Sequence, residues 1–415
     1  MGPEPSVLTK SPHPIRLLLA LMLLMVIATY FWLESRYPDL DNKALMAGAI
    51  QLQDPLSFEA RYQIDPAWPL WKQIGYTTLN WIFTNRNGMT FGVLFGSVML
   101  ALLRYLPRRG FNNGFANSFA GLAIGAPLGV CVNCAAPVAA GMYSGGSRAE
   151  TSLSAMIASP TFNVIVLSML ISLFPVYMVL IKVGLTLFIV LVVVPAICRL
   201  IPSDQLVMSE SESGSCIVNP AVGQVTNEET IGSAIYGFGK DFVESFWFIA
   251  SKTVPLMLLA GLLGATLATL VPFELISSLE AGAFTLILAA VVGVIAPVPM
   301  GFDIILAATL LSSGTSMTLV MVLLITLGTY SVYSHIIVSK FISTRLSLYL
   351  AASIVVLSIV GGLLAGAYND WEIQSGLEEL GISSLWESID FQIENTSNTD
   401  IGHNGYANLV STFRS

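Results

Sequence analysis

The stretch APLGVCVNCAAP (residues 126–137) lies in an apolar segment, residues 114–142, that is crowded with glycine, proline and alanine. Proline removes a backbone donor and kinks a helix, and glycine weakens one, so a single straight helix is disfavoured. The spacing predicts two half-helices of about ten to twelve residues, a length typical of re-entrant segments, with a break at 127–137. Arg109 and Arg148 flank the segment and place both of its ends in the cytoplasm. We therefore predict a re-entrant hairpin, with a kinked spanning helix as the alternative.

The composition of the 415-residue chain excludes a soluble protein. Apolar residues make up 54% of the chain and charged residues only 11%, whereas a soluble domain needs roughly 25% charged residues to cover its surface. The surface must therefore face lipid. Basic residues are nowhere dense enough to bind nucleic acid, and four cysteines do not make a disulfide framework. Only Cys131 and Cys134 are closely spaced.

Long apolar runs predict seven membrane spans besides the hairpins, because a ~30 Å hydrocarbon core takes about 20 helical residues. The runs are 15–33, 88–107, 149–173, 175–198, 247–271, 316–338 and 346–367. Positive residues collect on the cytoplasmic side, so Arg16 places the N-terminus inside, and the same rule places the C-terminal tail outside. Tyr30, Phe31 and Trp32 at the end of the first run are typical of an interfacial aromatic belt.

Shifts in composition divide the chain into five parts, with a polar Ser/Glu-rich stretch between two membrane halves and eight acids against one base in the last part. The predicted parts are an N-terminal anchor helix with an extracytoplasmic loop (1–87), a first membrane repeat (88–199), a cytoplasmic linker (200–246), a second membrane repeat (247–367) and an acidic extracytoplasmic tail (368–415). Trp81 falls in the predicted loop. Apolar positions over 371–393 indicate an amphipathic surface helix in the tail.

The two membrane halves repeat one pattern. VVGVIAPVP (291–299) matches GVCVNCAAP (129–137), and residues 312–331 match 144–163 in size and chemistry. Each half has one span, one hairpin and two further spans, which is an odd number of crossings, so the second copy must lie upside down. The predicted fold is an all-α polytopic membrane protein with two inverted repeats, each a broken re-entrant helical hairpin plus spanning helices, and about seven full spans.

Inverted repeats whose broken elements meet near the midplane are a recurring plan of secondary transporters. Non-helical backbone within the bilayer is tolerated only where it is buried or lines a wet cavity. We therefore predict that the two breaks, 129–137 and 293–301, face each other across one polar cavity.

Cys131 and Cys134 are the candidate soft ligands in the first break, with Asn133 between them. Thiolates bind soft ions and thiophilic metalloids, so two sulfurs in an extended break can form a small ligand cluster. The alternative is that two small apolar side chains pack at a helix crossing.

Asp303 follows the second break, and an ionisable group at membrane depth is expensive and typical of function. Its carboxylate can carry a coupling proton or receive a cation; the alternative is a position at the outer interface. Lys182, near the start of its span, can extend its amine to the interface. Ser159 and Asn163, polar residues inside an apolar span beside Pro160, are expected to line the cavity, and a helix-packing hydrogen bond is the alternative for them. The predicted substrate-binding residues are Cys131, Asn133, Cys134, Pro137, Ser159, Asn163, Pro299, Asp303, Thr329 and Ser331.

The break APLGVCVNCAAP, followed by GGSRAETSLSAMIASPTFN (145–163), resembles the predicted permease family that includes the ArsP-type organoarsenical efflux permeases. Members show a C-x-C-x-x-x-P break and then a glycine-led helix that ends in A-S-P-x-x-N. Cys131 stands at the first family cysteine, Asn133 replaces the second, and Cys134 is an extra neighbour. The resemblance covers both repeats in architecture and is specific over 126–163. The downstream motif is matched by Ala158, Ser159, Pro160 and Asn163.

The residues and the resemblance together predict a secondary permease, acting in efflux, that moves a small thiophilic solute such as a trivalent arsenical through a midplane site. The alternative is an intramembrane thiol–disulfide electron carrier that uses Cys131 and Cys134. Such carriers generally have a cysteine in each repeat, and VVGVIAPVPMG (291–301) has none. We expect no enzyme activity, no cofactor and no metal site. The expected partners are the solute and the lipid of the inner cell membrane, and a homo-oligomer stays open.

Overall fold

The computed structural model describes residues 13–36, 38, 60–106, 111–201, 230–270 and 282–379. These residues form helices and no strand, which confirms the all-α class. The described residues up to Ala365 form one compact unit, and those from Gly366 onward belong to a second. The helix breaks and the residues of the candidate site all belong to the first unit.

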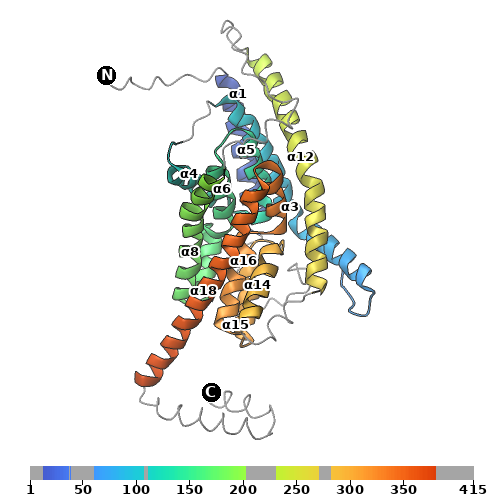
Figure 1. Ribbon diagram of the computed structural model, residues 1–415. Coiled ribbons are helices and arrows are strands. Elements are labelled where there is room, and N and C mark those ends of the chain that lie inside the picture. Colours follow the sequence, from blue (N-terminus) through green and yellow to red (C-terminus); the bar gives the residue numbers. More distant parts are fainter. Residues whose placement is uncertain are drawn as a thin grey trace, which may run out of the picture. The chain divides into compact units, whose positions relative to one another are not determined.

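The first half of the chain forms an initial helix, a long helix, a broken hairpin, a bent helix pair and a further span (Figure 1). In chain order the elements are α1 (Pro14–Tyr30) with the π-helical segment η1 (Phe31–Arg36), α3 (Leu70–Tyr105), α4 (Gly114–Leu128), α5 (Val132–Ser144), α6 (Ala149–Thr161), α7 (Val164–Leu173) and α8 (Val176–Phe188), which continues through the π-helical segment η2 (Ile189–Val193) into α9 (Val194–Leu200).

The second half of the chain repeats this order from the long helix onward. Its elements are α12 (Ile231–Leu270), α14 (Ala283–Ile295), α15 (Phe302–Ser312), α16 (Met317–Thr329), α17 (Val332–Phe341) and α18 (Thr344–Glu379). Within the described residues, five helices are long and apolar enough to cross a membrane, and seven if each bent pair counts as one span. This agrees with the seven spans predicted from the apolar runs.

The bent helix pair is the feature in which the two halves match most closely. The α6–α7 pair bends by 47° and the α16–α17 pair by 41°, and α6 and α16 have 13 residues each while α7 and α17 have 10 each. Figure 1 shows α4 and α5 in one half of the bundle and α14 and α15 in the other. The inverted orientation of the second copy stays a prediction.

Both ends of the first broken segment lie at the same end of the bundle. A β-carbon on Gly114, at the start of α4, would lie 3.7 Å from a carboxylate oxygen of Glu150 and 3.9 Å from Nε of Arg199. The α4 helix therefore starts beside the start of α6, and α5 ends at Ser144, directly before α6 begins. A kinked spanning helix would end at the opposite end, so this segment is a re-entrant hairpin.

The breaks are shorter than the prolines suggest. The first break is residues 129–131, because Gly129 adopts φ 59° and ends α4 in the left-handed conformation that glycine favours. Pro127 and Pro137 lie inside α4 and α5, so the predicted break at 127–137 was too wide. The second break, residues 296–301, also contains a left-handed glycine, but at its end: Gly301, with φ 80°, directly precedes α15.

Three long helices extend beyond the apolar runs that predicted them. The α3 helix begins at Leu70 rather than at residue 88, and α12 begins at Ile231 rather than at 247. The α18 helix continues to Glu379, so the first residues of the predicted surface helix at 371–393 are its last turns; residues 380–393 lie outside the described part of the chain. Hydropathy detects only the apolar portion of a helix, which explains the difference.

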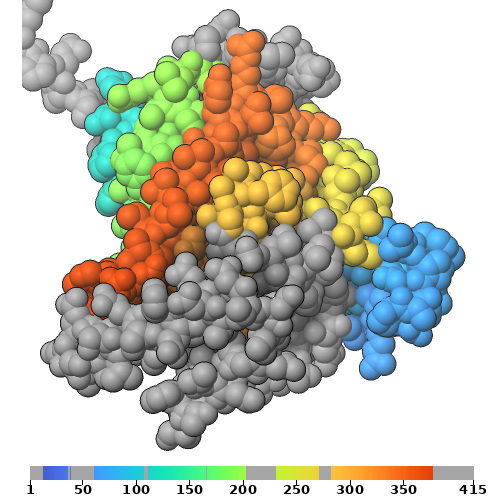
Figure 2. Space-filling view, turned by 60° about the horizontal axis from the view of Figure 1, so that its bottom comes forward, coloured from blue at the N-terminus to red at the C-terminus, as the bar shows by residue number. Residues whose placement is uncertain are grey.

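The outer surface is apolar, as a lipid-facing surface requires. Figure 2 shows α14, in gold, on the surface of the molecule, and its exposed side chains include Phe284 and Ile287. Leu180 on α8 and Leu258 on α12 are exposed in the same way. A soluble protein rarely exposes so many large apolar side chains to water, so these faces contact lipid.

A ladder of three glycines brings α3 against the first hairpin. Gly88, Gly92 and Gly96 lie one helical turn apart, and a β-carbon on any of them would collide with Cys134 or Pro137 of α5. Small residues at this spacing let membrane helices approach closely. The ladder therefore fixes the position of α5 and of the cysteines at its start.

Candidate functional site

The first hairpin is in direct contact with the second break through Asn133, which lies in the first turn of α5. Its Nδ2 donates to the carbonyl oxygen of Val298 at 3.0 Å, and its Oδ1 accepts from the hydroxyl of Ser331 at 2.6 Å. Asn133 and Ser331 are fully buried. One amide therefore joins the first hairpin, the second break and the bend of the α16–α17 pair.

The first turn of α17 reinforces this junction. Ser331 caps α17 by accepting the N–H of Ser334 at 3.2 Å, and the Ser334 hydroxyl donates to the carbonyl oxygen of Val132 at 3.3 Å. The α5 helix packs on α17, and α15 packs on α7. These are equivalent pairings in the two halves of the chain.

The two cysteines lie side by side at the start of α5. Their Sγ atoms are 2.6 Å apart, and Cys131 caps the helix by accepting the N–H of Cys134 at 3.3 Å. Neither cysteine is part of a disulfide, and both are buried. Within the described residues, no three His, Cys, Asp or Glu side chains gather to hold a metal ion. The pair offers two soft donors to a single thiophilic atom.

Two tryptophans donate to the backbone of the breaks. The Trp32 indole N–H donates to the carbonyl oxygen of Leu128, beside the first break, at 2.9 Å, and that of Trp81 donates to the carbonyl oxygen of Pro297 in the second break at 2.5 Å. Lipid cannot satisfy such carbonyl groups. Each indole therefore stabilises a break from outside its hairpin.

Neither tryptophan was predicted to lie at the site. Phe31 and Trp32 were assigned to an interfacial belt, but Phe31 is buried and stacks on Phe91 with ring centroids 4.0 Å apart. Trp81 was assigned to an extracytoplasmic loop, but it lies in α3 and is fully buried. The indole N–H could have indicated this role, because broken helices leave carbonyl groups that need a hydrogen-bond donor.

The remaining predicted polar residues hold the backbone of the breaks and bends. The Ser159 hydroxyl donates to the carbonyl of Val130 and accepts its N–H, at 3.2 and 3.1 Å. Asn163 is buried in the bend between α6 and α7, where its side chain packs against Gly129. The Thr329 hydroxyl donates to the carbonyl of Ile325 in its own helix.

The two predicted prolines occupy different settings. Pro137 lies inside α5, where its backbone packs against the glycine ladder of α3. Pro299 lies in the second break, and its carbonyl accepts the N–H of Phe302 at 3.2 Å. Pro299 therefore belongs to the backbone turn that leads from the break into α15.

Asp303 forms a buried ion pair with Lys182. The Lys182 Nζ lies 2.5 Å from Oδ2 of Asp303 and donates to the carbonyl of Leu324 at 2.7 Å. The side chains of Lys182 and Asp303 are 1% and 8% exposed. The expectation that Lys182 extends to the interface is therefore wrong, and Asp303 does not lie at an exposed interface. The sequence could not show that a partner 121 residues away supplies the opposite charge.

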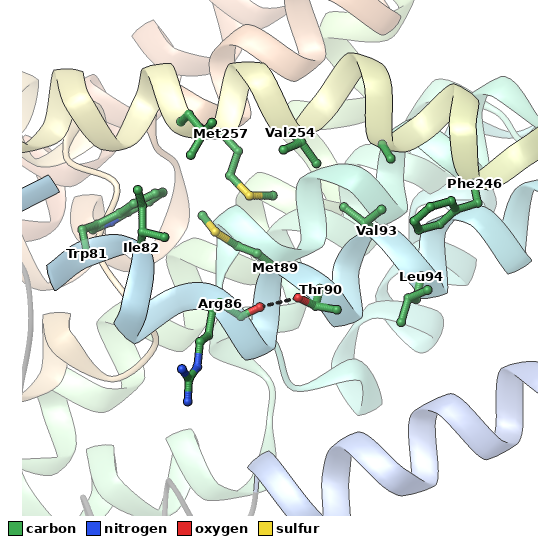
Figure 3. A pocket seen from close by; sticks show the side chains of 12 residues that line it. Trp81, Ile82, Arg86, Met89, Thr90, Val93, Leu94, Phe246, Val254 and Met257 are labelled. Carbon is green, nitrogen blue, oxygen red and sulfur yellow. Dashed lines mark hydrogen bonds between the residues drawn. The ribbon is translucent and has the colours of Figure 1, made fainter. Parts of the chain in front are cut away.

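An apolar groove of about 360 Å³ lies between α3 and α12, outside the breaks. Figure 3 shows Met89 and Met257 facing each other in it, with the Arg86 side chain directed away. Trp81, which donates to the second break, lies at one end of this groove. The groove is lined by Trp81, Ile82, Arg86, Met89, Thr90, Val93, Leu94, Phe246, Ala250, Val254, Met257 and Leu258.

Comparison with known proteins gives one match. The family described as predicted permease, ArsP_1, matches residues 93–367. No curated protein and no solved structure matches the chain. The matched range runs from α3 to α18 and includes both hairpins, both bends and the Lys182–Asp303 pair.

Proposed function

Because the chain belongs to the ArsP_1 family of predicted permeases, we propose that it is a secondary permease whose solute binds between the two helix breaks. One observation carries this proposal: Asn133 of the first hairpin hydrogen-bonds to Val298 in the second break. Broken helices from two repeats that meet in this way are the usual construction of a secondary-transporter site. The family indicates a transporter rather than an enzyme.

The cysteines favour a thiophilic solute, such as a trivalent arsenical. Two sulfurs that lie side by side can both bind one soft atom after a small adjustment of their side chains, and Asn133 can offer an amide dipole beside them. We place the site in the inner cell membrane, with the N-terminus cytoplasmic and the C-terminal tail outside, and we assign the direction as efflux. The resemblance noted for residues 126–163 supports this assignment.

The structure has the arrangement of a closed state. Cys131 and Cys134 are 4% and 3% exposed, so a solute reaches them only if the breaks separate. The 47° and 41° bends lie next to the breaks and are suited to act as hinges, because a few residues at the ends of elements can absorb such motion. Alternating access would then move one hairpin relative to the other.

Uptake of phenylarsine oxide, a trivalent arsenical, into everted membrane vesicles tests the proposal. Wild-type vesicles should accumulate the probe and Cys131→Ser vesicles should not, because the first soft donor is lost. Cys134→Ser should retain more transport, since Cys134 has no counterpart in the family pattern. Cys198→Ser is the matched control, a buried free cysteine outside the breaks, and should transport as wild type. Full transport by both break variants would overturn the thiophilic site.

The thiol–disulfide carrier stays the alternative because the two sulfurs are adjacent. Such a carrier would pass electrons to a second redox pair, and the second break has no cysteine at residues 296–301. Trapping the thiols with maleimide in living cells separates the two functions. A permease should hold Cys131 and Cys134 reduced throughout growth, whereas a carrier would show a substantial disulfide fraction.

A further inference from the structure

The Lys182–Asp303 pair joins the two halves of the protein within the membrane. Lys182 belongs to the last span of the first half, on α8, and Asp303 to the second hairpin, two residues after Gly301. A buried ion pair adds little stability compared with apolar residues of similar size, because desolvation offsets the attraction. Stability alone therefore does not account for a pair at this place.

On the described helices that pack against the pair, no other charged side chain lies beside it. The α8 helix packs on α6, α7 and α16, and α15 packs on α7 and α16. No ionisable side chain is present on α7 or α16, and α6 carries only Glu150, which lies in its first turn beside Arg199. Gly361 of α18 touches Ile181 and Leu185 of α8, and residues 350–365 of α18 contain no ionisable group either. Among the described residues, Asp303 is thus the group that supplies the counter-charge of Lys182.

The pair is mechanically connected to the candidate site. A β-carbon on Gly328 would collide with Oδ2 of Asp303 and crowd Nζ of Lys182, so the pair packs directly against α16. Ser331 lies in the bend three residues after Gly328, and its hydroxyl donates to Oδ1 of Asn133. The bend of the α16–α17 pair therefore connects the charge state of Asp303 to the position of the first hairpin.

We propose that Asp303 is the proton-binding site of the transport cycle, with Lys182 as the counter-charge that converts protonation into opening. This rests on the proposed permease function. The Asp303 carboxylate takes up one proton to become a neutral carboxylic acid, while Lys182 keeps its ammonium charge. A buried charge that loses its partner is strongly unfavourable, so the protonated protein shifts from this closed state to one in which Lys182 reaches water. Release of the proton restores the pair and closes the breaks.

Thiol labelling tests the proposal without a solute. In a Cys198→Ser/Cys216→Ser background, N-ethylmaleimide reacts only with Cys131 and Cys134, and the rate at each pH is divided by that of the denatured chain, because maleimide needs the thiolate. The corrected rate should be about tenfold higher at pH 5.5 than at pH 8.0, the size of a modest population shift. Asp303→Asn, which copies the protonated state, should label rapidly at both pH values.

Two further variants complete the test. Lys182→Gln/Asp303→Asn removes both charges, so it has no unpaired charge to hinder folding and should label slowly at both pH values. Glu150→Gln removes an acid outside the pair and should keep the wild-type pH response. A wild-type rate that does not change with pH, or a pH response that survives in the double variant, would overturn the proton site.

Phenylarsine oxide uptake with the same variants separates this inference from the permease function. Uptake that is equal at both pH values and unchanged by Asp303→Asn would overturn the proton site and leave the permease. A pH response of labelling without any uptake of the probe would support the proton site and overturn the proposed solute.

Discussion

Replacing Asn133 with alanine should weaken the contact between the two breaks more than any other single polar change. The substitution removes the donor to Val298 and the acceptor of Ser331. An unsatisfied buried polar group costs about 1–3 kcal/mol, and Ser331 keeps its contact with Ser334. The expected loss in the free energy of unfolding is therefore about 1–3 kcal/mol, because the Val298 carbonyl is the group left unsatisfied.

Reversible unfolding in mixed detergent micelles measures this free energy. Ser97→Ala is the matched control, because Ser97 is fully buried and its hydroxyl bonds only to a carbonyl of its own helix; its loss should stay below about 1 kcal/mol. A double-mutant cycle between Asn133 and Ser331 should give a coupling of about 0.5–2 kcal/mol. Zero coupling, or an Asn133→Ala variant as stable as the control, would refute the role of Asn133 as the junction.

Three further changes have definite expected outcomes. Trp81→Phe keeps an aromatic side chain but removes the donor to the second break, so it should cost at least about 1–3 kcal/mol of unfolding free energy, and a variant as stable as wild type would show that the indole N–H is not needed. Gly92→Leu would collide with the Cys134 backbone and should abolish folded protein in size-exclusion chromatography, whereas Gly75→Leu, which meets nothing within 4 Å, should fold normally. A reporter fused at residue 380 should be active only outside the cytoplasm, and a cytoplasmic signal would contradict the predicted topology.

Sequence reasoning predicted the broken elements well because their signals are local. Glycine and proline limit helix formation at the residue where they stand, so both helix breaks followed from residue spacing, and the first hairpin followed once the flanking arginines, Arg109 and Arg148, were added. The exact ends of the first break were not predictable in this way. Pro127 and Pro137 are accommodated inside helices, and Gly129 ends α4 through its own backbone conformation.

The contacts between distant segments could not be predicted. Lys182 near a span end is expected to extend toward water, and only the fold shows that Asp303 receives its charge instead. Trp81 looked like a loop residue because the sequence around it is polar, yet its indole satisfies the second break. The glycine ladder on α3 was different: Gly88, Gly92 and Gly96 have a readable spacing, and it would have indicated close packing of that helix.

The central claim is that solute binds between the two helix breaks, and a density map of the full chain with phenylarsine oxide bound tests it most directly. Arsenic density is expected at the sulfurs of Cys131 and Cys134, beside Asn133 and facing Val298 of the second break. Arsenic density elsewhere, for example in the groove between α3 and α12 with both sulfurs free, would contradict it.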